Sequence, residues 1–272
     1  MTNFRLLYRG FLLCSGVVVS LLWTGSVLLA GDKGGVVESV SHGEIHWGKG
    51  TLVVTGSGAP DLRAPNAAVA RLGAERAAKM SAFRNILEAV QGARVQSGQT
   101  VGDLLATQPE MRTKVQGVVR NFKVLDTRYY SDGGVDLVVE VPLSGVLLET
   151  LVPAGASGDT ATAGGRGVLI QAKGMKLVPA LAPKILDESG NELYSAAIVN
   201  QAAALKWGYV AYYKTLKQAK KDVRIGKQPL IVKALRPDTA GGSDIVLEAS
   251  EVSILKSAMA SLRQGRIGII VD

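Results

Sequence analysis

The sequence predicts an α+β protein of two small domains, in each of which helices pack on a mostly antiparallel sheet. Strand-like runs precede and follow two helical runs in each half, an order typical of α+β folds. Hydrophobic residues make up 47% of the chain and charged residues 20%, so both halves have the apolar content for a core. A tract of small residues, 154–165, separates a first domain over residues 31–153 from a second over residues 166–272. Its composition indicates a flexible linker.

Residues 1–30 are predicted to be a signal peptide or a membrane anchor. Arg5 and Arg9 give the segment a basic start, and an apolar run without charged residues follows, as in secretory signals. The alternative is an uncleaved helix over residues 11–30, which is just long enough to span a bilayer. Under either interpretation the rest of the chain is exported. After cleavage it is expected in the periplasm or at the periphery of the outer membrane, and without cleavage it would be anchored in the inner membrane by residues 11–30.

Cys14 is the one cysteine of the sequence and lies within this leader. Leu13 precedes it, where a lipoprotein signal has a small residue, so the sequence argues against a lipid anchor. Cleavage after Ser26 or Ala30, two positions with suitable small residues, would remove Cys14. The mature protein would then hold no thiol for a disulfide or a cysteine–metal site.

The first domain is expected to hold two helices and three strands after a glycine-rich entry segment, residues 32–48. Asn66 is a candidate N-cap, Thr100 and Asp103 have the spacing of a capping box, and Pro109 limits the helix that this box begins. The expected elements are a strand over 51–55, a turn over 56–58, a helix over 66–91, a helix over 100–109, a strand over 115–130, a turn over 131–134 and a strand over 135–141.

The long helix has one face of small and apolar residues at three- and four-residue steps, which lets a helix lie close to a sheet. This face consists of Ala67, Ala70, Ala74, Ala77, Ala78, Ala82, Ile86 and Val90. In the strand expected over residues 135–141 of the same domain, apolar and polar residues alternate. Its apolar face consists of Val135, Leu137, Val139 and Val141. We expect the helix to cover that face of the sheet.

The second domain is expected to begin and end with strands and to contain two helices. Gly208 interrupts the first helical pattern and weakens it. The expected elements are a strand over 167–172, a hairpin over 185–194, a helix over 200–222, a strand over 230–235, a loop over 238–243, a strand over 244–248, a helix over 250–265 and a strand over 267–271.

The segment over residues 42–50 has the spacing of two chemical motifs but lacks essential residues. Gly43–Gly50 almost matches a phosphate-binding loop, but Gly50 stands where the magnesium-binding Ser or Thr belongs, and a strand pattern follows in place of a helix. His42 and His46 are four residues apart, yet the glycines around them indicate a turn rather than a metal-binding helix. We therefore predict no catalytic, cofactor-binding or metal-binding residue and no enzyme activity.

The formal charge of +8 is concentrated in the second half, where residues 166–272 contain 16 basic and 9 acidic residues. A basic cluster lies at and beyond the end of the helix expected over residues 200–222, after several aromatic residues. Its members are Lys214, Lys217, Lys220, Lys221, Arg224 and Lys227. They are candidate anion-binding residues for peptidoglycan or anionic lipid, since an exported protein meets no nucleic acid. The alternative is a solvated helix face whose lysines favour the helix dipole.

Four sequence motifs in the first domain occur in a distinctive order. They are ARLGAERAA at Ala70–Ala78, TVGD at Thr100–Asp103, VQG at Val115–Gly117 and the turn DGG at Asp132–Gly134. In this order the region over residues 50–152 resembles the LPP-twenty lipoprotein family, the N-terminal part of flagellar assembly protein T and flagellar protein P. The resemblance implies an envelope protein without a catalytic role for this domain. Some of these relatives build structures around the flagellar motor.

The predicted function is that of a non-catalytic cell-envelope protein that acts in assembly through contacts with envelope proteins or with copies of itself. The alternative is a binding module for peptidoglycan or anionic lipid that uses the basic second domain. No cofactor is expected under either hypothesis. The missing lipoprotein signal before Cys14 departs from the family pattern and leaves lipid anchoring in doubt.

Overall fold

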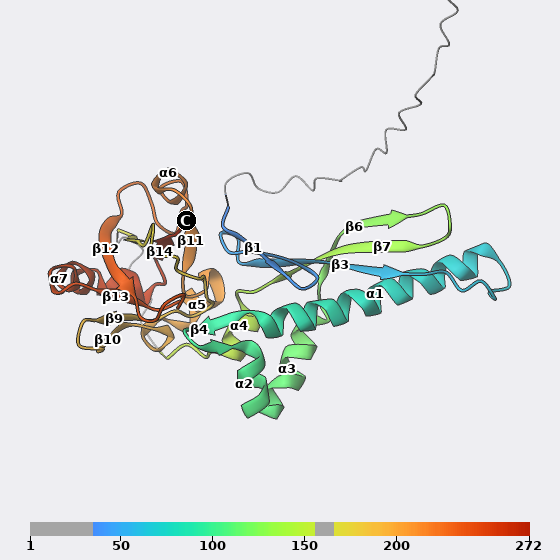
Figure 1. Cartoon of the computed structure of the whole chain (residues 1–272), viewed down its shortest axis with the longest axis horizontal. Helices are drawn as coiled ribbons and strands as arrows, with labels where there is room; N and C mark the ends of the chain where they lie inside the picture. The colour runs from blue at the N-terminus through green and yellow to red at the C-terminus, as the bar shows by residue number, and fades with distance from the viewer. Residues whose placement is uncertain (1–34, 156–165) are drawn as a thin grey trace, which may run out of the picture. The chain divides into compact units, whose positions relative to one another are not determined.

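The computed structural model describes residues 35–155 and 166–272, which belong to one compact unit, Gly34–Asp272 (Figure 1). A five-stranded sheet lies in the first half and a seven-stranded sheet in the second, and helices accompany both. The predicted α+β class is therefore confirmed. The leader and residues 156–165 of the expected linker lie outside the described part. Within that part, no helix has the length and apolar character needed to cross a membrane.

The first sheet is antiparallel throughout, with the strand order β1-β2-β3-β7-β6. Its strands are β1 (Val37–Val40), β2 (Gly43–His46), β3 (Thr51–Gly58), β6 (Lys123–Tyr129) and β7 (Val135–Pro142). The entry segment predicted over residues 32–48 contains two strands that the sequence did not predict, β1 and β2. Ile45 and Trp47 point into the core from here, with 1% and 5% exposure, and their burial stabilises the added hairpin.

The long helix α1 (Ala67–Gly92) covers one face of β3 and β7 (Figure 1). Asn66 caps it as predicted, because its Oδ1 accepts the N–H of Val69 at 2.9 Å. The expected alanine-rich face is confirmed over most of its length, although Ala67 and Ala77 are exposed. The buried helix residues are Ala74, Ala78, Ala82, Ile86, Ala89 and Val90.

Glycines in β3 allow α1 to approach the sheet closely. The sequence placed Gly56 and Gly58 in a turn, but both lie in the strand. A Cβ at Gly56 would lie 2.5 Å from the carbonyl oxygen of Ala78, and one at Gly58 would lie 2.0 Å from that of Ala74. Helix backbone thus occupies the space that side chains would need, which explains why small residues face each other here.

Two further helices pack against α1 on the side away from the sheet, α2 (Val101–Thr107) and α3 (Pro109–Val119) (Figure 1). The predicted capping box of α2 is present: Asp103 N–H donates to Thr100 Oγ1 at 3.2 Å, and Thr100 N–H donates to Asp103 Oδ2 at 2.8 Å. The strand expected over residues 115–130 begins only at Lys123, because residues 115–119 are helical and bury apolar side chains four residues apart.

Three short elements of the first half were absent from the sequence prediction. They are the hairpin strands β4 (Arg94–Gln96) and β5 (Gln99–Thr100) and the helix α4 (Val146–Leu151). Leu147, Leu148 and Leu151 of α4 are buried, and α4 contacts α3 and the second half. Elements this short give too few residues for a periodic pattern to be recognised.

The second sheet has the order β10-β9-β13-β12-β8-β14-β11. Its strands are β8 (Val168–Gln171), β9 (Ile185–Asp187), β10 (Glu192–Tyr194), β11 (Ala211–Tyr213), β12 (Leu230–Pro237), β13 (Ile245–Leu247) and β14 (Ile267–Ile270). The expectation of a mostly antiparallel sheet is wrong for this half, because four of its six strand pairings are parallel. The central strands β8 and β14 are almost wholly buried, as parallel strands usually are.

The helices of this half are shorter than predicted. They are α5 (Gln201–Trp207), α6 (Leu216–Ala219), α7 (Ala249–Ser257) and α8 (Met259–Arg263), with a 3₁₀ turn at Ala196–Ile198. The single helix expected over residues 200–222 is wrong. Gly208 has φ +70° and ends α5, and the aromatic run that follows forms β11 beside β14. The predicted hairpin over 185–194 is present, with Gly190 at φ +84° in its turn.

The hairpin β4–β5 joins the two halves through main-chain hydrogen bonds. The N–H groups of Leu181 and Ala182 donate to the carbonyl oxygens of Arg94 and Val95 at 2.9 and 2.8 Å. Ser97 Oγ accepts two further N–H groups from the second half, those of residues 243 and 244, at 2.9 and 2.8 Å. The halves therefore share a hydrogen-bonded junction as well as the chain connection.

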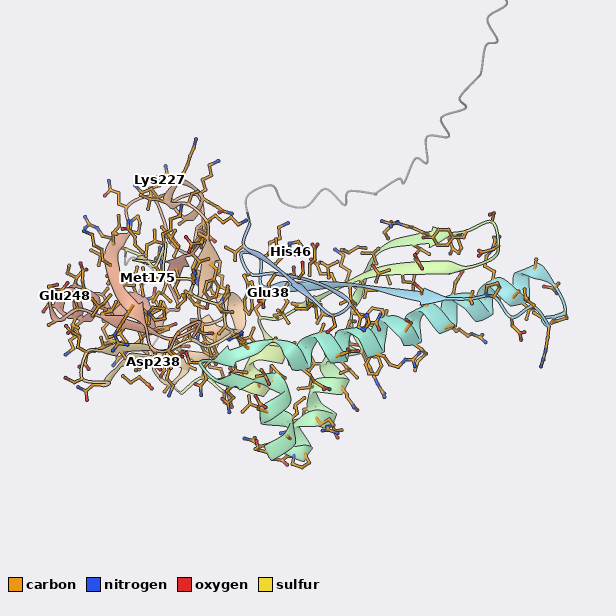
Figure 2. All side chains as sticks on the ribbon, in the orientation of Figure 1. Glu38, His46, Met175, Lys227, Asp238 and Glu248 are labelled. Atoms are coloured by element: carbon orange, nitrogen blue, oxygen red, sulfur yellow. The ribbon has the colours of Figure 1, made fainter. Side chains whose placement is uncertain are left out.

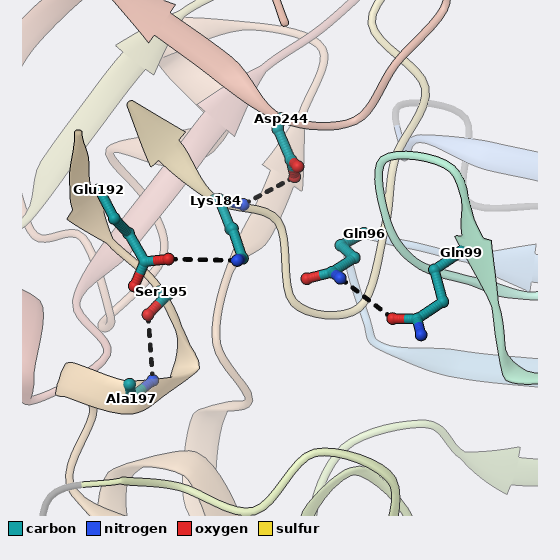
Figure 3. Close-up of polar contacts among 7 residues, drawn as sticks. All are labelled: Gln96, Gln99, Lys184, Glu192, Ser195, Ala197 and Asp244. Carbon is teal, nitrogen blue, oxygen red and sulfur yellow. Dashed lines mark hydrogen bonds and ion pairs between the residues drawn. The ribbon is translucent and has the colours of Figure 1, made fainter. Parts of the chain in front are cut away.

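Asp244 lies at this junction and also orders the next segment of the second half. Its Oδ1 accepts the N–H of Lys184 at 2.8 Å, and the Lys184 ammonium pairs with Glu192 at 3.2 Å (Figure 3). Burial raises the pKa of the Asp244 carboxyl above its ordinary value, while the Lys184 N–H favours the ionised form. The first linker residues are also held, since Gly155 N–H donates to the carbonyl oxygen of Ala196 at 3.3 Å.

Candidate functional site

The predicted basic cluster lies on a loop around α6, residues 214–227, which we call the basic loop. It leaves the sheet at the end of β11 and returns before β12. Thr215 begins the short helix, because its Oγ1 accepts the N–H of Gln218 at 3.2 Å. Ala219 and Ile225 anchor the loop in a small core of its own, at 0% and 1% exposure. The loop is therefore a fixed platform.

Five lysines of the cluster are exposed on this platform. They are Lys214, Lys217, Lys220, Lys221 and Lys227. Figure 2 shows Lys227 at the top of the second half in this view, where Figure 1 labels α6. The apolar side chain of Val223 lies among them and is 79% exposed. The surface of the loop thus combines five positive charges with one solvent-facing valine.

Arg224 does not belong to this exposed cluster, although the sequence placed it there. It is 3% exposed, and its guanidinium donates to three carbonyl oxygens, those of Gly265 at 2.5 Å, Trp207 at 2.7 Å and Gly208 at 3.0 Å. Desolvation by burial lowers the pKa of Arg224, and the three carbonyl dipoles favour its charge. Arg224 therefore fixes the fold and is not available to bind an anion.

The tyrosines before the lysines are core residues and do not share the basic surface. Tyr209, Tyr212 and Tyr213 are each at most 3% exposed. The hydroxyl of Tyr213 donates to Asp222 Oδ2 at 2.7 Å, which ties the one acidic residue of the basic loop to β11. Burial raises the pKa of all three hydroxyls.

The near-match to a phosphate-binding loop, Gly43–Gly50, forms strand β2 and the turn after it, and strand β3 follows as predicted. His42 Nε2 lies 3.2 Å from Glu88 of α1, and His46 Nε2 lies 3.7 Å from Glu44. His42 is exposed, whereas His46 is partly buried. Among the residues that the structure describes, no three His, Cys, Asp or Glu side chains are grouped so as to hold a metal ion. The absence of nucleotide and metal chemistry stays a prediction.

A cleft of about 210 Å³ opens beside the basic loop, and sequence reasoning did not find it. Its walls come from the β2–β3 turn, the segment after β7, the end of α5, the start of β11 and two residues of the basic loop. The lining residues are Trp47, Gly48, Lys49, Gly50, Ser144, Lys206, Trp207, Val210, Ala211, Asp222 and Arg224. A smaller hollow of about 30 Å³ shares Trp47, Gly50, Ser144, Trp207 and Val210. Segments more than 150 positions apart in the sequence meet here, so no local pattern could indicate it.

The two tryptophans of the cleft are held differently. Trp47 is 5% exposed; its Nε1 donates to Glu38 Oε2 at 2.8 Å, and its ring meets that of Tyr212 edge to face at 5.6 Å between centroids. Trp207 is partly exposed, and the ammonium of Lys206 lies 4.7 Å from its ring centroid. Trp47 is thus a rigid wall, while the face of the Trp207 ring is covered by the flexible side chain of Lys206.

Comparison with known protein families gives a match for the second half. Residues 167–272 match the family model of the second domain of Tp0624 from Treponema pallidum. No curated protein matches the chain. The match begins one residue before β8 and includes the basic loop and the α5–β11 wall of the cleft. The resemblance of residues 50–152 to the LPP-twenty family and to flagellar proteins stays a prediction.

Proposed function

We propose that this protein is an exported, non-catalytic protein of the bacterial cell envelope, and that its basic loop docks on an anionic lipid surface. The observation that carries the proposal is the group of five exposed lysines around the exposed Val223. Their charges attract an anionic surface, and a fixed platform presents them with little further ordering on contact. The leader predicted over residues 1–30 supplies the route to the envelope.

Val223 favours lipid over peptidoglycan as the partner of the basic loop. A hydrated glycan strand offers little to an isolated, solvent-facing valine, whereas a bilayer lets an apolar side chain insert between headgroups while the lysines contact them. Asp222 does not oppose this contact strongly, because its carboxylate accepts the Tyr213 hydroxyl and the N–H of Arg224, at 2.7 and 2.8 Å. The loop therefore has the amphipathic chemistry of a peripheral membrane contact.

The test is co-sedimentation of the full chain with vesicles that contain phosphatidylglycerol, compared with neutral phosphatidylcholine vesicles. We expect binding to the anionic vesicles alone, and a loss of binding as added salt screens the lysines. The variant that replaces Lys214, Lys217, Lys220 and Lys221 by Gln should lose this binding.

A matched variant controls for net charge. It replaces four exposed lysines elsewhere in the second half by Gln, Lys173, Lys176, Lys233 and Lys256. Both variants lose four positive charges, so only a localised contact predicts that the loop variant fails while the control binds. Equal losses would contradict a docking site. Sedimentation with cell-wall sacculi that is lost with the loop lysines, without vesicle binding, would assign the loop to peptidoglycan instead.

A specific observation also supports assembly through the first sheet. β6 is an edge strand that pairs with β7 alone among the described strands, and Val124 and Leu125 on it are 41% and 46% exposed. An exposed edge with apolar side chains can pair with a strand of another chain. Leu125→Lys should then weaken self-association in analytical ultracentrifugation without changing vesicle binding. If wild-type protein is monomeric and captures no envelope protein, this second function is lost.

A further inference from the structure

The cleft between Trp47 and Trp207 has the features of a small-ligand site, and the five exposed lysines of the basic loop are not among its lining residues. It is concave, it has indole walls, and several polar groups converge on it. The adjoining 30 Å³ hollow extends it along the same tryptophans. Both halves of the chain contribute walls, so the site exists only when the halves are joined as the structure shows.

The charged residues that line the cleft determine which charge a ligand should carry. Three cationic side chains and one anionic side chain line the cleft, Lys49, Lys206, Arg224 and Asp222. Arg224 and Asp222 are engaged in the wall, through three carbonyl oxygens and through Tyr213 respectively. The charge best placed for a ligand is the Lys206 ammonium, which lies over the face of the Trp207 ring at 4.7 Å from the ring centroid. An anionic group would attract it away from that ring.

The remaining lining sets the shape and polarity of the ligand. The Trp207 ring offers a flat apolar face to a ligand once Lys206 has moved. Gly48 and Gly50 expose main chain without side chains over it, and Ser144 adds a hydroxyl. A ligand that satisfies all of these walls has an apolar ring face, hydroxyl or amide groups around its rim, and one negative charge.

We propose that the cleft binds an acidic saccharide. The C–H face of a pyranose ring lies on the Trp207 indole, its carboxylate pairs with the Lys206 ammonium, and its hydroxyl or amide groups contact the glycine turn and Ser144. Trp47 holds the opposite wall in place through Glu38 and Tyr212. This site goes beyond the proposed lipid contact and does not depend on it.

Three probes distinguish the contribution of the sugar ring to binding from that of the carboxylate. N-acetylmuramic acid carries a pyranose ring and a lactyl carboxylate, N-acetylglucosamine carries the ring alone, and lactate carries the carboxylate alone. Each is titrated into the full chain by calorimetry, with tryptophan fluorescence as a second readout. We expect saturable binding of N-acetylmuramic acid, and binding of N-acetylglucosamine about tenfold weaker, which is the size of one charge-assisted hydrogen bond. Lactate should not saturate.

Two variants test which lining residue contacts which part of the ligand. Lys206→Gln should reduce the affinity for N-acetylmuramic acid to that for N-acetylglucosamine, while Trp207→Ala should abolish binding of both. Lys214→Gln, on the basic loop, is the control and should leave all affinities unchanged. Unchanged melting temperatures show that the variants are folded, as expected for two side chains at the surface of the cleft.

Other outcomes would overturn the proposal. Lactate binding as tightly as N-acetylmuramic acid would show an anion site without sugar recognition. Unchanged binding by Trp207→Ala would place the sugar elsewhere, and no saturable binding of N-acetylmuramic acid would remove the site altogether. Vesicle binding is measured separately. A negative saccharide titration therefore does not contradict the proposed lipid contact, and a negative vesicle sedimentation does not contradict the saccharide site.

Discussion

Arg224 donates a hydrogen bond from Nη1 to the main-chain carbonyl oxygen of Trp207 at 2.7 Å, so a buried cation holds the end of α5 at the mouth of the cleft. The same guanidinium reaches Gly208, which caps α5, and Gly265, which lies just beyond α8. Carbonyl groups at helix C-termini have no partner within the helix and carry partial negative charge. One side chain therefore satisfies the ends of two helices and positions Trp207.

Replacing Arg224 by Met is expected to lower the free energy of unfolding by about 3 kcal/mol, because three carbonyl oxygens lose their donor in a buried place. Arg224→Lys should recover only part of this loss, since an ammonium cannot reproduce the planar fork of donors. Urea denaturation measures both values. Lys227→Met, on the exposed side of the same loop, should change the stability by less than about 0.5 kcal/mol. A similar result for both positions would refute the structural role of Arg224.

Gly56 and Gly73 predict opposite effects for the same substitution. A Cβ at Gly56 would lie 2.2 Å from the main-chain nitrogen of Ala82, so Gly56→Ala must push α1 away from β3 and should cost about 3 kcal/mol. A Cβ at Gly73, within α1, meets nothing within 4 Å, and Gly73→Ala should stabilise the helix by about 0.5–1 kcal/mol. Thermal unfolding followed by circular dichroism compares the two. A tolerated Gly56→Ala would contradict the close approach of helix and sheet.

The sequence predicted features that depend on neighbours along the chain and missed those that depend on distant partners. The Asn66 cap and the Thr100 capping box were predicted because each involves residues within three positions. The burial of Arg224 could not be predicted, because its partner Gly265 is 41 residues away and the surrounding lysines are exposed. The parallel sheet left a signal in the apolar run at Val168–Ile170, since strands buried on both faces show no alternation.

Four tyrosines of the second half are expected to make the protein sensitive to alkali. Burial raises the pKa of Tyr194, Tyr209, Tyr212 and Tyr213 above the ordinary value of about 10. Above pH 10 the unfolded chain releases these protons while the native protein retains them, so the free energy of unfolding falls as the pH rises. Well below pH 10 these hydroxyls are protonated in both states, so they add no pH dependence to the free energy of unfolding.

Absorbance at the tyrosinate band checks this expectation. The native protein should show delayed ionisation followed by a steep rise where it unfolds, whereas protein in guanidinium chloride should titrate near pH 10 throughout. Tyr129 and Tyr130 also have raised pKa values, chiefly because their hydroxyls donate to Glu75 and Asp136. Native and denatured titration curves that coincide would show that the buried hydroxyls are not as the structure places them.

Ser97 tests whether the two halves behave as the independent domains that the sequence suggested. Its Oγ accepts the N–H groups of Ser243 and Asp244 at 2.9 and 2.8 Å, beside the main-chain bonds from Leu181 and Ala182. Since these contacts join the halves into one compact unit, far-ultraviolet dichroism and tryptophan fluorescence should report a single, coincident unfolding transition. Ser97→Ala leaves two N–H groups without an acceptor and should cost about 1–2 kcal/mol in the same transition. Ser189→Ala, in the exposed turn after β9, is the matched control and should change little. Two separate transitions in the wild-type chain, with Ser97→Ala affecting neither, would instead support two domains that fold on their own.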